Sequence, residues 1–296
     1  MFSGALLHLI GLLTTVTLFS GGSTAPVHTM FNSTPLNNSI ESLYSFKFDE
    51  TNGYVSQLDS TNAMDLEVVQ LIQLWWVGLT LGTNSSELLD LERHSARLLN
   101  KYSEPRTPQE RFLKVLAGTF IIRLAGIKGN KTLALKTFIK ISSELKLVLK
   151  EPTASQENML IAGVYHYSVG GIKMNNYLLK PFLALLPPAN SYEGKIYLIE
   201  CTKSNYNVIR TEAYYFLYKI DYEIYRLKSE AISHIKWLVN QYPNNLIFRL
   251  EQIKISEISG KLTPNHREDF IIMVNESELT KKQKDHFISK IDKLLQ

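Results

Sequence analysis

Apolar residues recur at spacings of three and four along most of this chain from residue 38 onward. In "SSELLDLERHSARLLNKY", for example, Leu88, Leu91 and Leu98 fall on one stripe, which is the period of an amphipathic helix. Short breaks such as "KGNK", "PPANS" and "YPNN" separate the apolar segments. Connections of that length place neighbouring helices antiparallel. The pattern predicts an all-α protein built of antiparallel helical hairpins.

The break within "AISHIKWLVNQYPNNLIFRL", residues 231–250, indicates how two hairpins join. Pro243 cannot continue the preceding helix, and Asn245 is a good N-cap for the next one. A repeat of about 34 residues that closes on such a proline is the tetratricopeptide pattern. In this register the structural positions are Tyr215, Tyr222, Ala231, Ile235 and Pro243. The small Ala231 is expected at a close helix crossing, whereas Lys219 stands where a small residue is usual.

A wider resemblance rests on four stretches: "FKFDET", "QLIQLWWVGLTLG", "FIIRLAGIKGNKTLALKTF" and the segment that starts "GVYHYSVGGIKMNNYLL". In order, spacing and unusual pairs such as Trp75-Trp76, the chain resembles a family of exported bacterial tetratricopeptide-repeat proteins over residues 38–260. The resemblance implies a TPR-like α-solenoid of stacked hairpins. It also implies an interaction module, and it supplies no reaction.

The N-terminal segment has a different character. Residues 5–19, "ALLHLIGLLTTVTLF", are a charge-free apolar run followed by small residues, which is typical of a signal peptide. We predict a signal-peptide-like segment at 1–25, a flexible leader at 26–37 and a helical-repeat domain at 38–296. Export to the periplasm or cell envelope follows from this segment. Because no basic residue precedes Lys47, the alternative is an uncleaved anchor that makes the protein a membrane-attached accessory subunit.

Composition argues against several classes of function. The 32 Lys and Arg against 28 Asp and Glu leave a net charge of only +4, too small to predict nucleic-acid binding. The single cysteine, Cys201, excludes an internal disulfide and a Cys-rich zinc site. The seven histidines include no pair spaced to present two nitrogens from one helical face. We predict neither a metal nor a cofactor.

No residue pattern amounts to a catalytic motif. Ser143 and Lys146 match a serine–lysine spacing, but the companion motifs are missing. The alternative to a non-catalytic protein is a hydrolase or ligand-processing enzyme on a helical toroid, with Tyr165, His166 and Glu212 in one pocket. A deep cleft that gathers these three side chains would favour the enzyme, and scattered positions would favour the scaffold.

Tyrosines concentrate in the middle third of the chain. A large ring with a polar tip suits a binding surface, and it also fills seams between helices. In "NVIRTEAYYFLYKI" the four-residue spacing puts Arg210, Tyr214 and Tyr218 on one stripe. We predict that this stripe, with Tyr165 and Tyr167, contacts a protein or peptide partner along the concave face of the solenoid. The alternative is that these side chains pack against neighbouring helices.

The last segment, "ELTKKQKDHFISKIDKLL", is a basic amphipathic helix near 278–295. It is expected to cap the solenoid by covering the final apolar face while its outer side stays polar. Binding to an anionic membrane surface is the alternative for the same residues.

Nearer the N-terminus, the adjacent Trp75 and Trp76 point about 100° apart on a helix. Both are therefore buried only if that helix is covered on two sides.

Overall fold

The computed structural model of the protein describes residues 29–58, 63–175, 186–258, 260 and 266–295. All regular structure in these ranges is helical, which confirms the predicted all-α class. The helices are α2 (Thr34–Tyr44), α3 (Phe48–Val55), α4 (Ala63–Leu81), α5 (Ser86–Lys101), α6 (Pro108–Ile127), α7 (Lys131–Lys150), α8 (Gln156–Asn175), α10 (Ser191–Cys201), α11 (Asn207–Ile220), the π-helical turn η3 (Asp221–Tyr225), α12 (Lys228–Gln241), α13 (Leu246–Ile258), α14 (His266–Glu276) and α15 (Lys281–Leu294). The predicted signal-peptide-like segment at 1–25 lies outside the described residues.

Local capping side chains account for where several helices begin. Thr107 accepts a hydrogen bond from the N–H of Glu110 (3.1 Å), and the Glu110 carboxylate accepts one from the N–H of Thr107, so a reciprocal capping box opens α6. Asn130 accepts from the N–H of Leu133 and opens α7 in a simpler way. Such side chains satisfy N–H groups that have no partner inside the helix. The breaks in the apolar pattern therefore coincide with helix ends.

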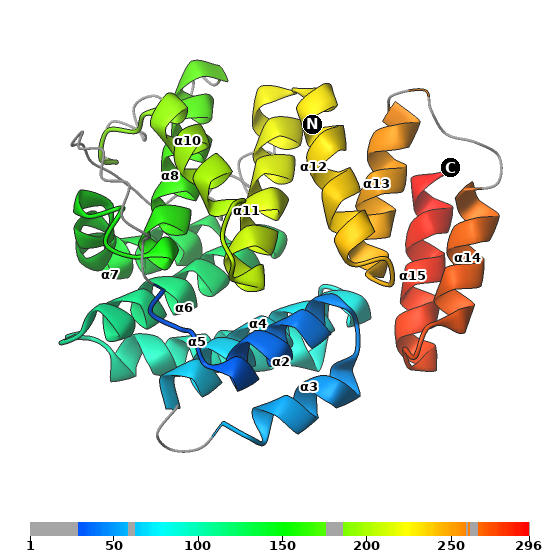
Figure 1. The fold of residues 1–296 in the computed structure, drawn as a ribbon, viewed down its shortest axis with the longest axis horizontal. Coiled ribbons are helices and arrows are strands. Elements are labelled where there is room, and N and C mark those ends of the chain that lie inside the picture. Colours follow the sequence, from blue (N-terminus) through cyan, green and yellow to red (C-terminus); the bar gives the residue numbers. More distant parts are fainter. Residues whose placement is uncertain (1–28, 59–62, 176–185, 259, 261–265, 296) are drawn as a thin grey trace.

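Helices that follow one another in sequence pack together along most of the chain. The contacts run from α4 through α5, α6 and α7 to α8, and from α8 through α10, α11, α12 and α13 to α14 and α15. In Figure 1 helices α8 to α13 stand in the upper half of the molecule, and α2 to α5 lie across the lower half.

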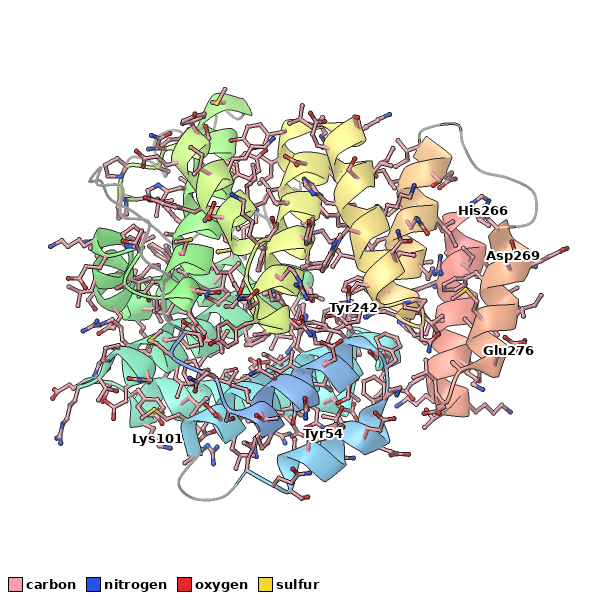
Figure 2. The ribbon with its side chains drawn as sticks, viewed as in Figure 1. Tyr54, Lys101, Tyr242, His266, Asp269 and Glu276 are labelled. Atoms are coloured by element: carbon pink, nitrogen blue, oxygen red, sulfur yellow. The ribbon has the colours of Figure 1, made fainter. Side chains whose placement is uncertain are left out.

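Contacts also join helices that are far apart in sequence, since α2 packs against α11, and α15 packs against α4 (Figure 1). Gln283 of α15 donates from Nε2 to Oγ1 of Thr80 in α4 (2.6 Å). Figure 2 shows Tyr242 at the end of α12 that faces the lower layer, where its ring lies 5.3 Å from the ring of Tyr44. The C-terminal helix α15 therefore packs against a helix from the first half of the chain.

The predicted flexible leader at 26–37 is wrong in its second half, because α2 begins inside this range. Ser33 accepts a hydrogen bond from the N–H of Leu36, and Pro35 occupies the first turn of the helix, where proline is well tolerated. Leu36 and Phe31 are buried. The Ser, Thr, Pro and Asn residues that indicated a flexible segment are those of a helix start.

Trp75 and Trp76 are both buried because α4 is covered on two sides. The Trp75 ring lies 5.8 Å from the ring of Phe120 on α6. Trp76 faces the other way and meets Tyr44 of α2 and Phe248 of α13 edge-on, with 5.4 Å between ring centroids in each case. The adjacent tryptophans thus join α4 to three other helices.

The repeat register predicted near residues 212–245 has mostly buried residues at its structural positions. Four of its five structural positions are buried: Tyr215, Tyr222, Ala231 and Ile235. The fifth, Pro243, lies in the turn between α12 and α13. Lys219, the departure from the repeat pattern, is accommodated because its ammonium pairs with Glu251 (2.9 Å) and Glu223 (3.3 Å).

Candidate functional site

An apolar cavity of about 130 Å³ lies between the helices α2, α4 and α6 and the helices α8 and α11. Its apolar lining includes Leu36, Ile72, Trp75, Phe120, Val164 and Phe216. Three charged side chains also border it: Arg123, Glu157 and Glu212. A concave apolar space with a few convergent polar groups is the usual form of a ligand site, so this cavity is the candidate site.

Glu212 reaches the cavity from α11. Its Oε1 accepts a hydrogen bond from the phenol of Tyr44 at the end of α2 (2.6 Å). Burial raises the pKa of the Glu212 carboxyl, although nearby Arg123 and the bond from Tyr44 oppose this. Burial and the facing carboxylate together raise the pKa of the Tyr44 phenol well above its ordinary value. The phenol therefore keeps its proton and acts as the donor.

Arg123 enters the cavity from α6, one turn after Phe120. Its guanidinium carbon lies 4.1 Å from the centre of the Trp75 ring, with Phe120 and Phe216 at 5.7 and 5.9 Å. Stacking on aromatic faces holds a guanidinium in place and leaves its N–H groups free to bind. Within the part of the chain that the structure describes, Arg123 has no hydrogen-bond acceptor and no carboxylate within ion-pair distance.

Glu157, near the start of α8, binds the chain's own N-terminal segment. Its Oε1 accepts from the backbone N–H groups of Met30 (2.9 Å) and Phe31 (3.3 Å) and from the hydroxyl of Thr29. The Phe31 side chain borders the cavity and lies against the ring of Phe112, with 5.1 Å between centroids. Residues 29–31 therefore present backbone amides to a carboxylate and an aromatic ring to the cavity.

The predicted partner-binding stripe on α11 lies in helix seams. The Tyr214 ring stacks on Trp237 of α12 at 3.9 Å, and Arg210 lies over the same ring at 5.8 Å. Tyr218 is fully buried and donates from its hydroxyl to Glu251 (2.6 Å). In this conformation the stripe packs α11 against α12 and α13. This is the arrangement of the alternative hypothesis, in which these side chains contact neighbouring helices.

The other three predicted side chains on α8 lie away from the cavity lining. Tyr165 is fully buried and donates to the carbonyl of Pro187 (2.7 Å). His166 accepts at Nδ1 from the N–H of Asn190 (3.2 Å), and burial lowers the pKa of this imidazole to about 4. Tyr167 is buried as well. Neither Tyr165 nor His166 borders the cavity that Glu212 enters, so the structure does not gather these three side chains in one pocket.

Sequence reasoning missed a buried polar cluster around Asp221. This aspartate has no exposed surface, accepts a hydrogen bond from the Tyr167 hydroxyl, and lies 3.3 Å from Nε2 of His234 and 4.0 Å from Nζ of Lys195. It starts the π-helical turn η3, which ends at Arg226 in the left-handed conformation (φ 61°). The cluster ties η3 to α8, α10 and α12. No spacing in the sequence marks it, because its members come from four separate segments.

The described residues contain no group of three or more His, Cys, Asp or Glu side chains placed to hold a metal ion. Cys201 is buried, and burial raises the pKa of its thiol, which makes it a poor nucleophile. Among the described helices, none combines the length and the apolar character that crossing a bilayer requires.

Comparison with family models, with curated proteins and with solved structures finds no match to this chain. The tetratricopeptide resemblance therefore stays a prediction from the quoted motifs. The case for a site rests on the cavity and on the three charged side chains that border it.

Proposed function

We propose that this protein is a non-catalytic, TPR-like binding protein of the cell envelope that receives an apolar group of a peptide or protein partner in the cavity between α2, α4, α6, α8 and α11. The cavity itself is the observation that carries the proposal. Enclosing a side chain such as Leu or Phe contributes roughly 1.5–3 kcal/mol, which is enough for one anchor of a larger interface.

The groups that border the cavity support binding in preference to chemistry. Among the described residues that line it, the one hydroxyl-bearing side chain is Thr119, which donates to the carbonyl of Val115 (2.9 Å). Glu212 is bonded to Tyr44, and Glu157 is bonded to residues 29–31. A nucleophile needs a neighbouring base to activate it, and the described lining offers no such pair.

The contact of residues 29–31 with Glu157 supports a peptide as the partner. The carboxylate holds two consecutive backbone N–H groups while the Phe31 ring enters the cavity lining. A partner segment with an apolar side chain would use the same two kinds of contact. It would bind beside residues 29–31 or displace them.

A peptide-display selection with the folded protein tests the proposal, with Val164→Phe as the comparison. Val164 is half-buried and borders the cavity, so a larger ring there fills the space. We expect the wild type to enrich peptides that carry Phe or Leu, and Val164→Phe to bind them at least tenfold more weakly with an unchanged melting temperature. Leu147→Phe, at an exposed position of α7, is the control. Equal binding by Val164→Phe, or no enrichment at all, would refute the proposal.

A further inference from the structure

Among the charged side chains that border the cavity, Arg123 is the one with neither an ion pair nor a hydrogen bond in the described part of the chain. It stacks on Trp75, and in the described ranges no acceptor or carboxylate lies within bonding distance of its guanidinium. It is only half-buried by its own chain, because part of its surface faces the cavity. A charge beside an apolar space is costly unless it meets a counter-charge.

Neither of the two carboxylates that border the cavity lies within ion-pair distance of Arg123. Glu157 has its Oε1 occupied by three donors from residues 29–31. Glu212 accepts from Tyr44, and burial raises the pKa of its carboxyl, so its neutral form is favoured more than that of an ordinary glutamate. Arg123 is therefore left to meet the charge of whatever enters.

We propose that the group bound in the cavity is an apolar body that carries one carboxylate, with the carboxylate paired to Arg123 and the body packed against Trp75, Phe120 and Phe216. This inference rests on the proposed binding function and adds the chemical class of the ligand. The volume of about 130 Å³ is close to the roughly 150 Å³ of an engineered apolar cavity that holds benzene. A guanidinium binds a carboxylate through two parallel N–H donors, which fixes the orientation of so small a ligand.

Three probes of one size separate the charges. Benzoate carries the carboxylate, benzyl alcohol carries no charge, and benzylamine carries a positive charge at neutral pH. We expect calorimetric titration of the wild type to show benzoate binding at least tenfold tighter than benzyl alcohol, and benzylamine binding weakest. Equal affinity for benzoate and benzyl alcohol, or a preference for benzylamine, overturns the inference.

Two substitutions of Arg123 separate its charge from its size. Arg123→Gln should remove the preference for benzoate and leave the affinity for benzyl alcohol within about threefold, whereas Arg123→Lys should retain a preference. Arg93→Gln is the matched control, because Arg93 pairs with Asp90 on the exposed face of α5. A preference that survives Arg123→Gln overturns the inference.

Glu212→Gln keeps the inference testable if Arg123→Gln does not fold. It removes any negative charge that Glu212 carries near Arg123 and leaves Glu157 in place, so benzoate should bind at least as tightly as it binds the wild type, and benzyl alcohol equally well; weaker binding of benzoate alone overturns the inference. If no probe binds, the inference fails, while the peptide selection still decides the binding function.

A last experiment distinguishes the two sources of the carboxylate, a peptide or a free acid. The acidic groups of the selected peptides are converted to amides. Lost binding indicates a carboxylate carried by a peptide, and retained binding with displacement by benzoate indicates a free acid.

Discussion

Asn245 donates a hydrogen bond from Nδ2 to the backbone carbonyl of Tyr44, which lies 201 residues earlier in the chain (2.8 Å). Its Oδ1 accepts from the N–H groups of Ile247 and Phe248, both at 3.1 Å, and so caps α13. One fully buried side chain therefore starts a helix and joins it to the end of α2.

Replacing Asn245 should separate these two roles. Asn245→Asp keeps an acceptor for the cap but removes the donor to Tyr44, while Asn245→Ala removes both. We expect both variants to lower the free energy of unfolding, Asn245→Ala by roughly 2–4 kcal/mol, because a lost cap costs about 1 kcal/mol and an unsatisfied buried carbonyl about 1–3. Urea unfolding measures the loss. Asn244→Ala, in the exposed turn, should have little effect, and a stable Asn245→Ala would contradict the prediction.

Ala231 is fully buried in α12, where the repeat register expects a close helix crossing. Ala231→Leu should overpack this seam and lower the free energy of unfolding by about 1–3 kcal/mol. The neighbouring Ser233 is exposed, so Ser233→Leu adds the same side chain without the crowding. Identical urea midpoints for the two variants would show that Ala231 is not at a tight crossing.

Two glycines in left-handed backbone test the contact between α15 and α4. A Cβ on Gly82 (φ 96°) would lie 2.9 Å from Cε1 of His286 in α15, whereas a Cβ on Gly129 (φ 72°) would meet nothing within 4 Å. Gly129→Ala should cost about 1–2 kcal/mol through backbone strain alone. We expect Gly82→Ala to cost more than that, because the His286 ring of α15 must also shift. Equal losses in urea unfolding would argue against the packing of α15 on α4.

Stability should fall in mild acid. Burial lowers the pKa of His166 to about 4 in the folded chain, against roughly 6.5 when unfolded. Between these values the unfolded chain binds the extra proton, so the free energy of unfolding decreases as the pH falls from 6.5 to 4, by about 3 kcal/mol from this group. His166→Asn keeps an acceptor for Asn190 and should flatten the pH profile measured by thermal unfolding. An unaltered profile in the variant would exclude His166 as the cause.

The positions of helices could be predicted because their ends are set by nearby residues. The break predicted at "KGNK" falls between α6, Pro108–Ile127, and α7, Lys131–Lys150. Thr107 and Asn130 lie directly before those helices and cap them. The leader was placed wrongly for a related reason: the residues of a helix N-cap and of a flexible segment are the same types.

The site could not be predicted in the same way. Tyr44 and Glu212 are joined across 168 residues, and no local pattern ties one to the other. The enzyme alternative placed Glu212 in one pocket with Tyr165 and His166, but these residues lie far apart along the chain and no spacing in the sequence tests whether they meet. Nor can the sequence show that Arg123, an arginine in an apolar helix, faces a cavity.

The contacts of α2 with α11 and of α15 with α4 also bear on the order of folding events. An open array of hairpins makes only neighbour contacts, so it starts to fold anywhere and grows from there. Here Gln283 meets Thr80 across 203 residues, and closing so long a loop has an entropic cost that precedes the contact. We infer that the contacts of α2 with α11 and of α15 with α4 form last, and that part of the apolar surface around Trp76 stays exposed until then. A nascent chain is most prone to aggregate in that interval.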